Sequence, residues 1–292
     1  MREGAIKLAL IGCAVLSVLT TVTIIGILIK QSIAFFSMPE VSFGEFITGT
    51  QWNPLLGAEK HFGIWPLICG TAMITAVAMS VALPLGLITA IYLSEYARPR
   101  ARAILKPVLE VIGGIPTVVF GFFALMVITP GLQWLHDGFG VYNATGAGLA
   151  VGIMCLPIVT SLSEDALRAV PRSLREGAYA LGATRLEVSL KVVVPAALSG
   201  IIAAFLLAVA RAVGETMIVA LASGSRAQFT FDPRSEVQPM TGYMVQIFLG
   251  DVSNFGVEYL SSYAVAATLF VFTFALTWLG HIVRKRFREA YE

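Results

Sequence analysis

Residues 173–195, SLREGAYALGATRLEVSLKVVVP, form the most informative stretch of this sequence, because a charged segment passes there directly into a long apolar run. Ser173 and Glu176 have the Ser-x-x-Glu spacing of a capping box, which predicts a short helix beginning near Leu174. Gly182 is placed to end that helix, because glycine adopts the left-handed conformation that commonly follows a helix.

A second short helix is predicted directly after the first. Thr184 and Glu187 form another capping box, and the helix that they begin leads through Pro195 into the apolar run. Ala178 and Leu181 supply an apolar face to the pair of helices. The residues alone leave two interpretations open: an amphipathic pair lying at the membrane surface, or a docking surface for a cytoplasmic partner.

The composition places this segment in a membrane protein. Of the 292 residues, 57% are hydrophobic and 13% are charged, whereas soluble domains carry about 25% charged residues. A disordered chain, a disulfide scaffold and an ordinary cytosolic enzyme are thereby excluded. A membrane span needs about 20 apolar residues, and six runs qualify: 8–29, 67–93, 107–129, 146–162, 197–222 and 263–283. The fold class predicted is an all-α polytopic membrane protein with six transmembrane helices.

The distribution of basic residues predicts the orientation. With the N-terminus inside, fifteen of the 20 Lys and Arg residues are cytoplasmic, in segments 2–7, 98–106, 168–191 and 284–288. Four lie outside, at Lys30, Lys60, Arg226 and Arg234. This bias favours cytoplasmic placement of both termini. The first run is longer than the apolar core of a signal peptide, so we expect it to be retained as a span.

A pair of charged residues lies inside the fifth run. Arg211 and Glu215 are four residues apart, which places both side chains on one face of a continuous helix, about 6 Å apart. An unpaired arginine is costly in a bilayer, so the pair should face the protein interior. It is either a structural ion pair or part of an anion pathway. Glu215 could accept a hydrogen bond from a protonated oxyanion, which favours phosphate over sulfate.

Prolines interrupt three of the runs, at Pro84, Pro116 and Pro157. Each removes a backbone donor and predicts a kink, as in the broken helices of transporter pathways. Kinks without a role in transport remain the alternative. Gly148 and Gly152 form a small-xxx-small pair, which predicts a helix-packing face.

Several kinds of chemistry find no support in the sequence. The three cysteines and three histidines are scattered without metal-ligand spacing, so neither a metal site nor a cofactor is expected. No Gly-Lys dipeptide occurs, which excludes a Walker-type nucleotide loop. No Ser/His/Asp constellation can be assembled. The chain is therefore not expected to be an enzyme, and energy for transport would have to come from a separate ATPase.

The 173–195 stretch resembles the EAA motif of ABC-importer permeases. That motif has Glu-Ala-Ala, three residues, Gly, nine residues and then Ile-x-Leu-Pro. The residues here that match its positions are Glu176, Gly177, Ala178, Gly182, Val192, Val194 and Pro195. Gly177, Val192 and Val194 depart modestly from the pattern. The resemblance implies that this loop, with Leu181 on its surface, inserts into a groove of an ATPase subunit.

Other stretches are similar to phosphate permeases of the PstC type rather than the PstA type. They are RAVGETM at 211–217, GIPTVVFG at 114–121, GYMVQ at 242–246 and RFREAYE at 286–292. The likeness extends roughly from Leu67 to the C-terminus. Sulfate permeases carry a similar Arg-Ala-x-Gly-Glu stretch, so this pair alone does not identify the substrate.

The resemblance implies a type I, MetI-like importer fold. We expect an N-terminal helix and external connection at 1–66, a permease core at 67–283 with its coupling loop at 163–196, and a basic cytoplasmic tail at 284–292. The expected function is ATP-driven phosphate import across the inner (plasma) membrane. The implied partners are a PstA-like permease, a PstB-like ATPase dimer, an external PstS-like phosphate-binding protein and membrane lipid, and no nucleic acid.

Two alternative functions remain. One is a permease for another oxyanion, such as sulfate, molybdate or phosphonate. The other is a membrane signalling subunit that reports phosphate status.

Overall fold

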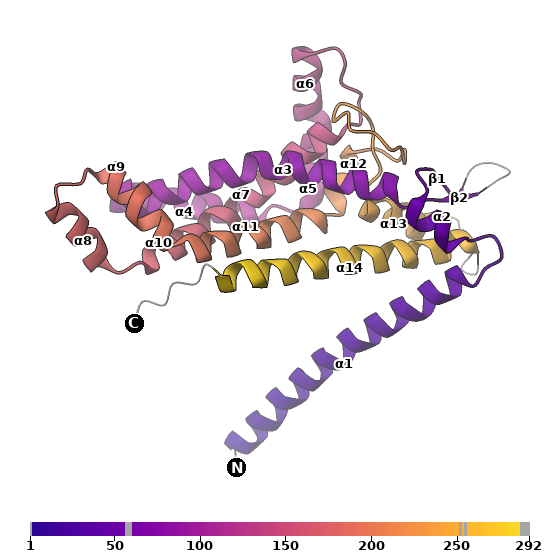
Figure 1. Cartoon of the computed structure of the whole chain (residues 1–292), viewed down its shortest axis with the longest axis horizontal. Coiled ribbons are helices and arrows are strands. Elements are labelled where there is room, and N and C mark those ends of the chain that lie inside the picture. The colour runs from indigo at the N-terminus through magenta and orange to yellow at the C-terminus, as the bar shows by residue number, and fades with distance from the viewer. Residues whose placement is uncertain (1, 56–59, 251–252, 254–255, 287–292) are drawn as a thin grey trace.

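The computed structural model describes residues 2–55, 60–250, 253 and 256–286, which form an elongated helical bundle (Figure 1). Five helical segments in these ranges are long and apolar enough to cross a membrane: Ile6–Phe36, Trp65–Tyr96, Thr117–Leu135, Ala144–Ala169 and Val257–Ile282. A sixth span results if the bent pair Arg185–Ala196 and Leu198–Val213 is one span. The all-α polytopic fold predicted from the sequence is confirmed.

The second, fourth and sixth predicted runs correspond to long helices. They are α3 (Trp65–Ile91), which continues through the π-helical turn η1 (Tyr92–Tyr96), α7 (Ala144–Ala169) and α14 (Val257–Arg286). Helix α14 includes 284–286 of the predicted tail, whereas residues 287–292 lie outside the described ranges.

The third predicted run, 107–129, is wrong in its boundaries. Helix α4 (Pro99–Gly114) ends before Ile115, whose ψ of 129° is extended, and Pro116 is the N-cap of α5 (Thr117–Phe123). A residue that precedes proline is biased away from helical conformation, which explains the break. The span itself is α5 followed by η2 (Ala124–Ile128) and α6 (Thr129–Leu135), and α4 is a separate amphipathic helix.

The fifth predicted run, 197–222, is also interrupted. The segment before it forms α9 (Arg185–Glu187), η3 (Val188–Val193) and α10 (Val194–Ala196), and the chain then bends by 71° into α11 (Leu198–Val213). Helix α11 ends at Gly214, and α12 (Met217–Ala222) follows after a break of three residues. This break separates Arg211 from Glu215.

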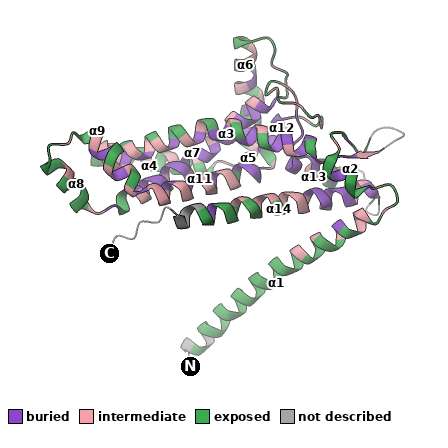
Figure 2. Ribbon diagram, viewed as in Figure 1, coloured by how far each residue is buried: buried purple, intermediate pink, exposed green. Residues whose placement is uncertain are grey.

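Helices α3 and α7 form the centre of the bundle, and glycines allow their close approach. A Cβ atom built on Gly148 would lie 2.7 Å from Val77 Cβ, and one on Gly152 would lie 2.9 Å from the backbone oxygen of Ala78. The predicted small-residue packing face is therefore confirmed. Helices α5, α11 and α12 complete this core, which is the buried middle of the molecule in Figure 2.

The end of the molecule that carries α2 (Phe43–Thr48) has an aromatic core of its own. The short antiparallel strands β1 (Trp52–Asn53) and β2 (His61–Phe62) pack there beside α13 (Met240–Leu249). The aromatic side chains in contact are Phe35, Phe46, Trp52, Phe62 and Tyr243. The structure buries one face of α13 against α12 and α14.

Helix α1 (Arg2–Phe36) contacts the bundle only near its C-terminal end, where the Ser32 hydroxyl donates to the backbone oxygen of Tyr263. The rest of α1 diverges from the body and is exposed (Figures 1 and 2). The N-terminal end of α1 and the C-terminal end of α14 both point toward the half of the molecule that carries α8 (Arg172–Ala180).

Candidate functional site

The first candidate site is the loop around α8, at the end of the bundle opposite α2 (Figure 1). Helix α8 ends in a Schellman motif: the Gly182 N–H donates to the Tyr179 oxygen and the Ala183 N–H donates to the Ala178 oxygen. Gly182 has a φ of +84°, which a residue with a side chain rarely adopts. The prediction that Gly182 ends this helix is confirmed.

The two predicted capping boxes have different outcomes. At Thr184 the box is complete, since the Glu187 N–H donates to the Thr184 hydroxyl oxygen and the Glu187 carboxylate accepts from the Thr184 N–H. That bond from the Thr184 N–H, followed by the bond from its hydroxyl, lowers the pKa of Glu187 to about 2. The box at Ser173 is wrong. Pro171 has no backbone N–H with which α7 could continue, and it is instead the N-cap of α8, which begins at Arg172, so Ser173 lies inside the first turn.

Most residues of the predicted coupling motif are accessible. Glu176, Gly177, Gly182 and Pro195 are exposed, and Leu181 is 90% exposed at the tip of the loop. Ala178 instead packs against the small core under the loop, so Ala178 and Leu181 do not form one apolar face. The loop therefore presents an exposed glutamate and an exposed leucine.

Two arginines attach this loop to the bundle. In the sequence they count only among the basic residues that indicate membrane orientation. Arg175 Nη2 lies 3.0 Å from Glu95 Oε1, and the same guanidinium donates to the backbone oxygens of Leu167 and Val170. Arg185 donates to the backbone oxygen of Glu95, and its guanidinium lies over the Tyr96 ring. An acidic residue at the end of the second apolar run is the only signal that could have indicated Glu95 as a partner.

A buried carboxylate lies near the same end of the bundle. The side chain of Glu164 in α7 is 1% exposed, and it forms ion pairs with Arg102, Lys106 and Arg168. Lys106 Nζ is 3.5 Å and Arg168 Nη1 is 3.6 Å from its oxygens. Helix α4 is thereby joined to α7. Sequence reasoning missed Glu164 because nothing in its spacing distinguishes it from other acidic residues near a span end.

The second candidate site is Arg211, and its predicted pairing with Glu215 is wrong. The structure describes both residues, and they form no ion pair within 4 Å. Arg211 is exposed near the end of α11, where Nη2 lies 3.9 Å from Met154 Sδ. Glu215 is 5% exposed, and its Oε1 accepts from the Ile218 N–H at the start of α12. Its backbone oxygen accepts from the Thr241 hydroxyl.

The cause is the early end of α11. The Gly214 N–H donates to the Ala210 and Ala212 oxygens, which closes the helix before Glu215 can lie one turn above Arg211. Glu215 therefore stabilises the N-terminus of α12, where a negative charge is favourable, and the Arg211 guanidinium has no carboxylate partner among the described residues.

The three prolines also differ from one another. Pro116 separates α4 from α5, as a helix-breaking proline should. Pro84 and Pro157 lie inside α3 and α7, which continue through them without interruption. Only Pro116 therefore marks a discontinuous helix.

Comparison with known proteins identifies the family to which this architecture belongs. The family model described as "Binding-protein-dependent transport system inner membrane component" matches residues 82–289. The chain belongs to this permease family. The "Probable ABC transporter permease protein YqgH" of Bacillus subtilis is 33% identical, over 96% of this chain and 90% of the relative. The "Phosphate transport system permease protein PstC" of Mesorhizobium japonicum is 31% identical, over 84% of this chain and 80% of the relative.

The fold of this binding-protein-dependent permease agrees with solved ABC importers. An inward-facing structure of the MetNI methionine ABC transporter superposes with a TM-score of 0.58 at 16% identity, covering 78% of this chain and 95% of that chain. The predicted MetI-like fold and the resemblance to PstC-type permeases are confirmed. The chain is a multi-pass inner-membrane component of a transport system rather than an enzyme.

Proposed function

We propose that this permease is one half of the translocation pathway of an ATP-driven importer of inorganic phosphate. The observation that carries the proposal is the exposed Arg211 at the end of α11, which has no carboxylate partner among the described residues. A guanidinium facing lipid is costly, so Arg211 would face a water-filled pathway shared with a second permease subunit. Its paired donors match the oxygens of a phosphate ion.

Glu215 supports this pathway indirectly. Its carboxylate accepts from the Ile218 N–H and so stabilises the break between α11 and α12. That break leaves Arg211 without a counter-charge, which favours transient contact with an anion over a permanent ion pair. The similarity to a phosphate permease of M. japonicum supports phosphate as the anion.

The loop around α8 would be the contact with the ATPase. Glu176 is exposed and Leu181 is 90% exposed, so neither has a role in packing within this chain. Glu176, Gly177, Ala178, Gly182 and Pro195 match positions of the EAA motif, and Leu181 lies between them, which supports docking onto a PstB-like ATPase dimer.

The excess of basic residues near α8 supports a cytoplasmic position for this end and for both termini. The permease core would then be 67–283, preceded by the helix and external connection at 1–66. A PstA-like second permease and an external PstS-like binding protein would complete the transporter.

The test is uptake of labelled phosphate in cells that lack this chain, complemented with wild type, Arg211→Gln or Arg100→Gln. Arg100 is exposed on α4 and serves as the matched control. We expect Arg211→Gln to reduce uptake at least tenfold at equal membrane abundance, with Arg100→Gln unchanged and excess sulfate without effect. Full uptake by Arg211→Gln would reduce Arg211 to a structural role. Inhibition by sulfate would indicate a permease for another oxyanion, and a phosphate response that persists without uptake would indicate a signalling subunit.

A further inference from the structure

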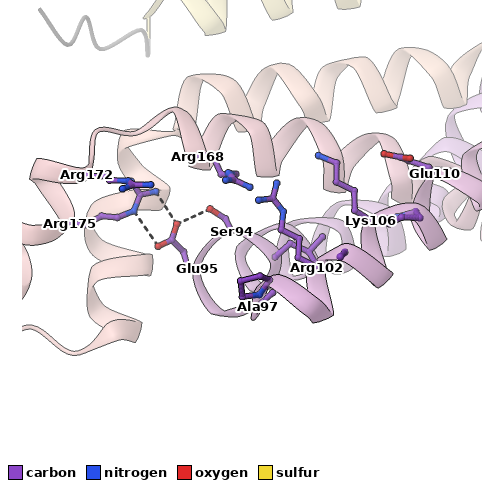
Figure 3. A pocket seen from close by; sticks show the side chains of 13 residues that line it. Ser94, Glu95, Ala97, Arg102, Lys106, Glu110, Arg168, Arg172 and Arg175 are labelled. Carbon is purple, nitrogen blue, oxygen red and sulfur yellow. Dashed lines mark hydrogen bonds and ion pairs between the residues drawn. The ribbon is translucent and has the colours of Figure 1, made fainter.

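A cavity of about 750 Å³ lies at the α8 end of the bundle, and Arg211 is not among the residues that line it. Its walls are the end of η1, one face of α4, the end of α7 and the start of α8 (Figure 3). Five basic side chains line it: Arg102, Lys106, Arg168, Arg172 and Arg175. Glu95 and Glu110 line it as well.

Only some of these cations are neutralised within the chain. Arg175 is bound to Glu95, and Arg102 is paired with the buried Glu164. Lys106 and Arg168 share that carboxylate at 3.5 and 3.6 Å and remain 32% and 47% exposed, and Lys106 Nζ also lies 3.9 Å from Asp165 Oδ1. Four carboxylates, those of Glu95, Glu110, Glu164 and Asp165, stand against the five cations, so the cavity keeps a net positive charge.

Arg172 is the clearest case of an available cation. It is exposed and has no hydrogen bond or ion pair with any other residue that the structure describes. Figure 3 shows it beside Arg175 at one end of the cavity, with Arg168 and Arg102 facing each other farther along. A ligand could therefore gain charge-assisted hydrogen bonds here without displacing an existing partner.

Helix dipoles add to this positive field. The first residues of two helices line the cavity, Pro99 of α4 and Arg172 of α8. The N-terminus of a helix carries a partial positive charge, which suits anions, and α8 also presents the Arg172 N–H there, whereas Pro99 has no N–H. The excess of Lys and Arg on the cytoplasmic side of membrane proteins explains why basic residues lie at this end. It does not explain why they gather around one cavity together with two helix N-termini.

The acidic residue Glu110 indicates which anion the cavity would select. Arg102, Lys106 and Glu110 follow one another at four-residue intervals on α4 and line the cavity together. A carboxylate repels a fully ionised anion but accepts a hydrogen bond from a protonated one. Phosphate near neutral pH carries such a hydroxyl group and sulfate does not, so this stripe favours a phosphate group.

We infer that this cavity is a binding site for a phosphate group at the cytoplasmic end of the permease, through which imported phosphate leaves. The inference rests on the proposed function for its cytoplasmic position. The same chemistry would also accept the phosphate of an anionic lipid headgroup, and the experiment distinguishes the two sources.

The experiment uses the full transporter in phosphatidylcholine vesicles with ATP inside and increasing inorganic phosphate inside. The initial rate of labelled phosphate uptake is measured for wild type, Arg168→Gln, Arg172→Gln and the control Arg100→Gln. We expect internal phosphate to inhibit wild type and Arg100→Gln equally. In Arg168→Gln and Arg172→Gln the half-inhibitory concentration should rise about tenfold, the effect of losing one charge-assisted hydrogen bond. Internal sulfate should inhibit weakly in all four.

A parallel series in vesicles that also contain phosphatidylglycerol identifies the source of the phosphate group. Unchanged inhibition of wild type assigns the site to free phosphate. Weaker inhibition of wild type, with no such change in Arg172→Gln, assigns it to a lipid headgroup. Equal inhibition of all variants in both series would overturn the inference while leaving phosphate uptake intact. Absence of wild-type uptake would overturn the proposed function, and this inference with it.

Discussion

Arg175 and Glu95, 80 residues apart in the chain, form a two-point contact, with Nη2 3.0 Å from Oε1 and Nε 3.3 Å from Oε2. The same guanidinium donates to the backbone oxygens of Leu167 and Val170 at the C-terminal end of α7, where carbonyl groups lack helical partners. Helix α8 is thereby attached to the ends of both central helices, α3 and α7. A displacement of α8 would pass directly to the core of the bundle.

The first prediction concerns this contact. Glu95→Gln and Arg175→Gln should each lower stability, and the double variant should lose less than the sum of the two. The coupling energy should be about 1–3 kcal/mol, because both side chains are mostly buried, at 8% and 16% exposure. Thermal unfolding of the purified permease in detergent measures this. Strict additivity of the two losses would show that the contact contributes nothing.

The second prediction concerns Glu164. Loss of its partner Arg102 should lower stability more than loss of the Glu164 carboxylate itself. Arg102→Gln leaves a carboxylate that is 1% exposed with only the two longer ion pairs to Lys106 and Arg168, and it should cost about 2–3 kcal/mol. Glu164→Gln leaves cations that can turn toward solvent, and it should cost about 1 kcal/mol. Unfolding midpoints of the two variants test this order, and a larger loss in Glu164→Gln would contradict it.

The packing of the apolar runs could be predicted from the sequence because it depends on local pattern. Gly148 and Gly152 indicate the packing face of α7, since small residues allow close helix approach, and the structure shows that α3 occupies it. Gly182 and Thr184 indicate the turn between α8 and α9, since their conformations depend on neighbours within a few residues. These features need no knowledge of the rest of the fold.

The predictions that were wrong depended on competition between local signals. Ser173 had a suitable capping partner, but Pro171 began the helix one residue before it. Arg211 and Glu215 had helical spacing, but the helix ended between them at Gly214. The position of Glu95 at the end of an apolar run was a signal, but its pairing with Arg175 could not be predicted, because the contact joins segments that only the tertiary fold brings together.

The third prediction tests the glycine contact between α3 and α7. Gly152→Ala places a Cβ atom 2.9 Å from the backbone oxygen of Ala78, so the helices must separate and stability should fall by about 1–3 kcal/mol. Gly12→Ala in α1 is the matched control, because a Cβ there meets nothing within 4 Å. Thermal unfolding of both variants measures the difference. Equal midpoints would refute tight packing at Gly152.

The fourth prediction concerns the pH dependence of the start of α9. Hydrogen bonds from Thr184 lower the pKa of Glu187 from 4.5 to about 2. The ionised carboxylate therefore stabilises the folded state fully above pH 4.5, and this contribution declines as the pH falls and is lost below about 2. Hydrogen exchange at 184–188, corrected for intrinsic rates, should show this decline in wild type. Thr184→Ala should move the decline toward pH 4.5, and identical profiles would contradict the prediction.

The last prediction concerns the exposed leucine at the tip of the α8 loop. Leu181 is 90% exposed and stabilises nothing within this chain, so Leu181→Asp should leave the unfolding midpoint unchanged. If Leu181 enters a groove on the ATPase, a buried aspartate there would be costly, and co-purification of the ATPase should fall at least tenfold. Leu249→Asp is the matched control, because Leu249 is 82% exposed and belongs to α13, which lies at the opposite end of the molecule from α8 (Figure 1). Retention of the ATPase by Leu181→Asp, or equal loss in both variants, would exclude this residue from the coupling contact.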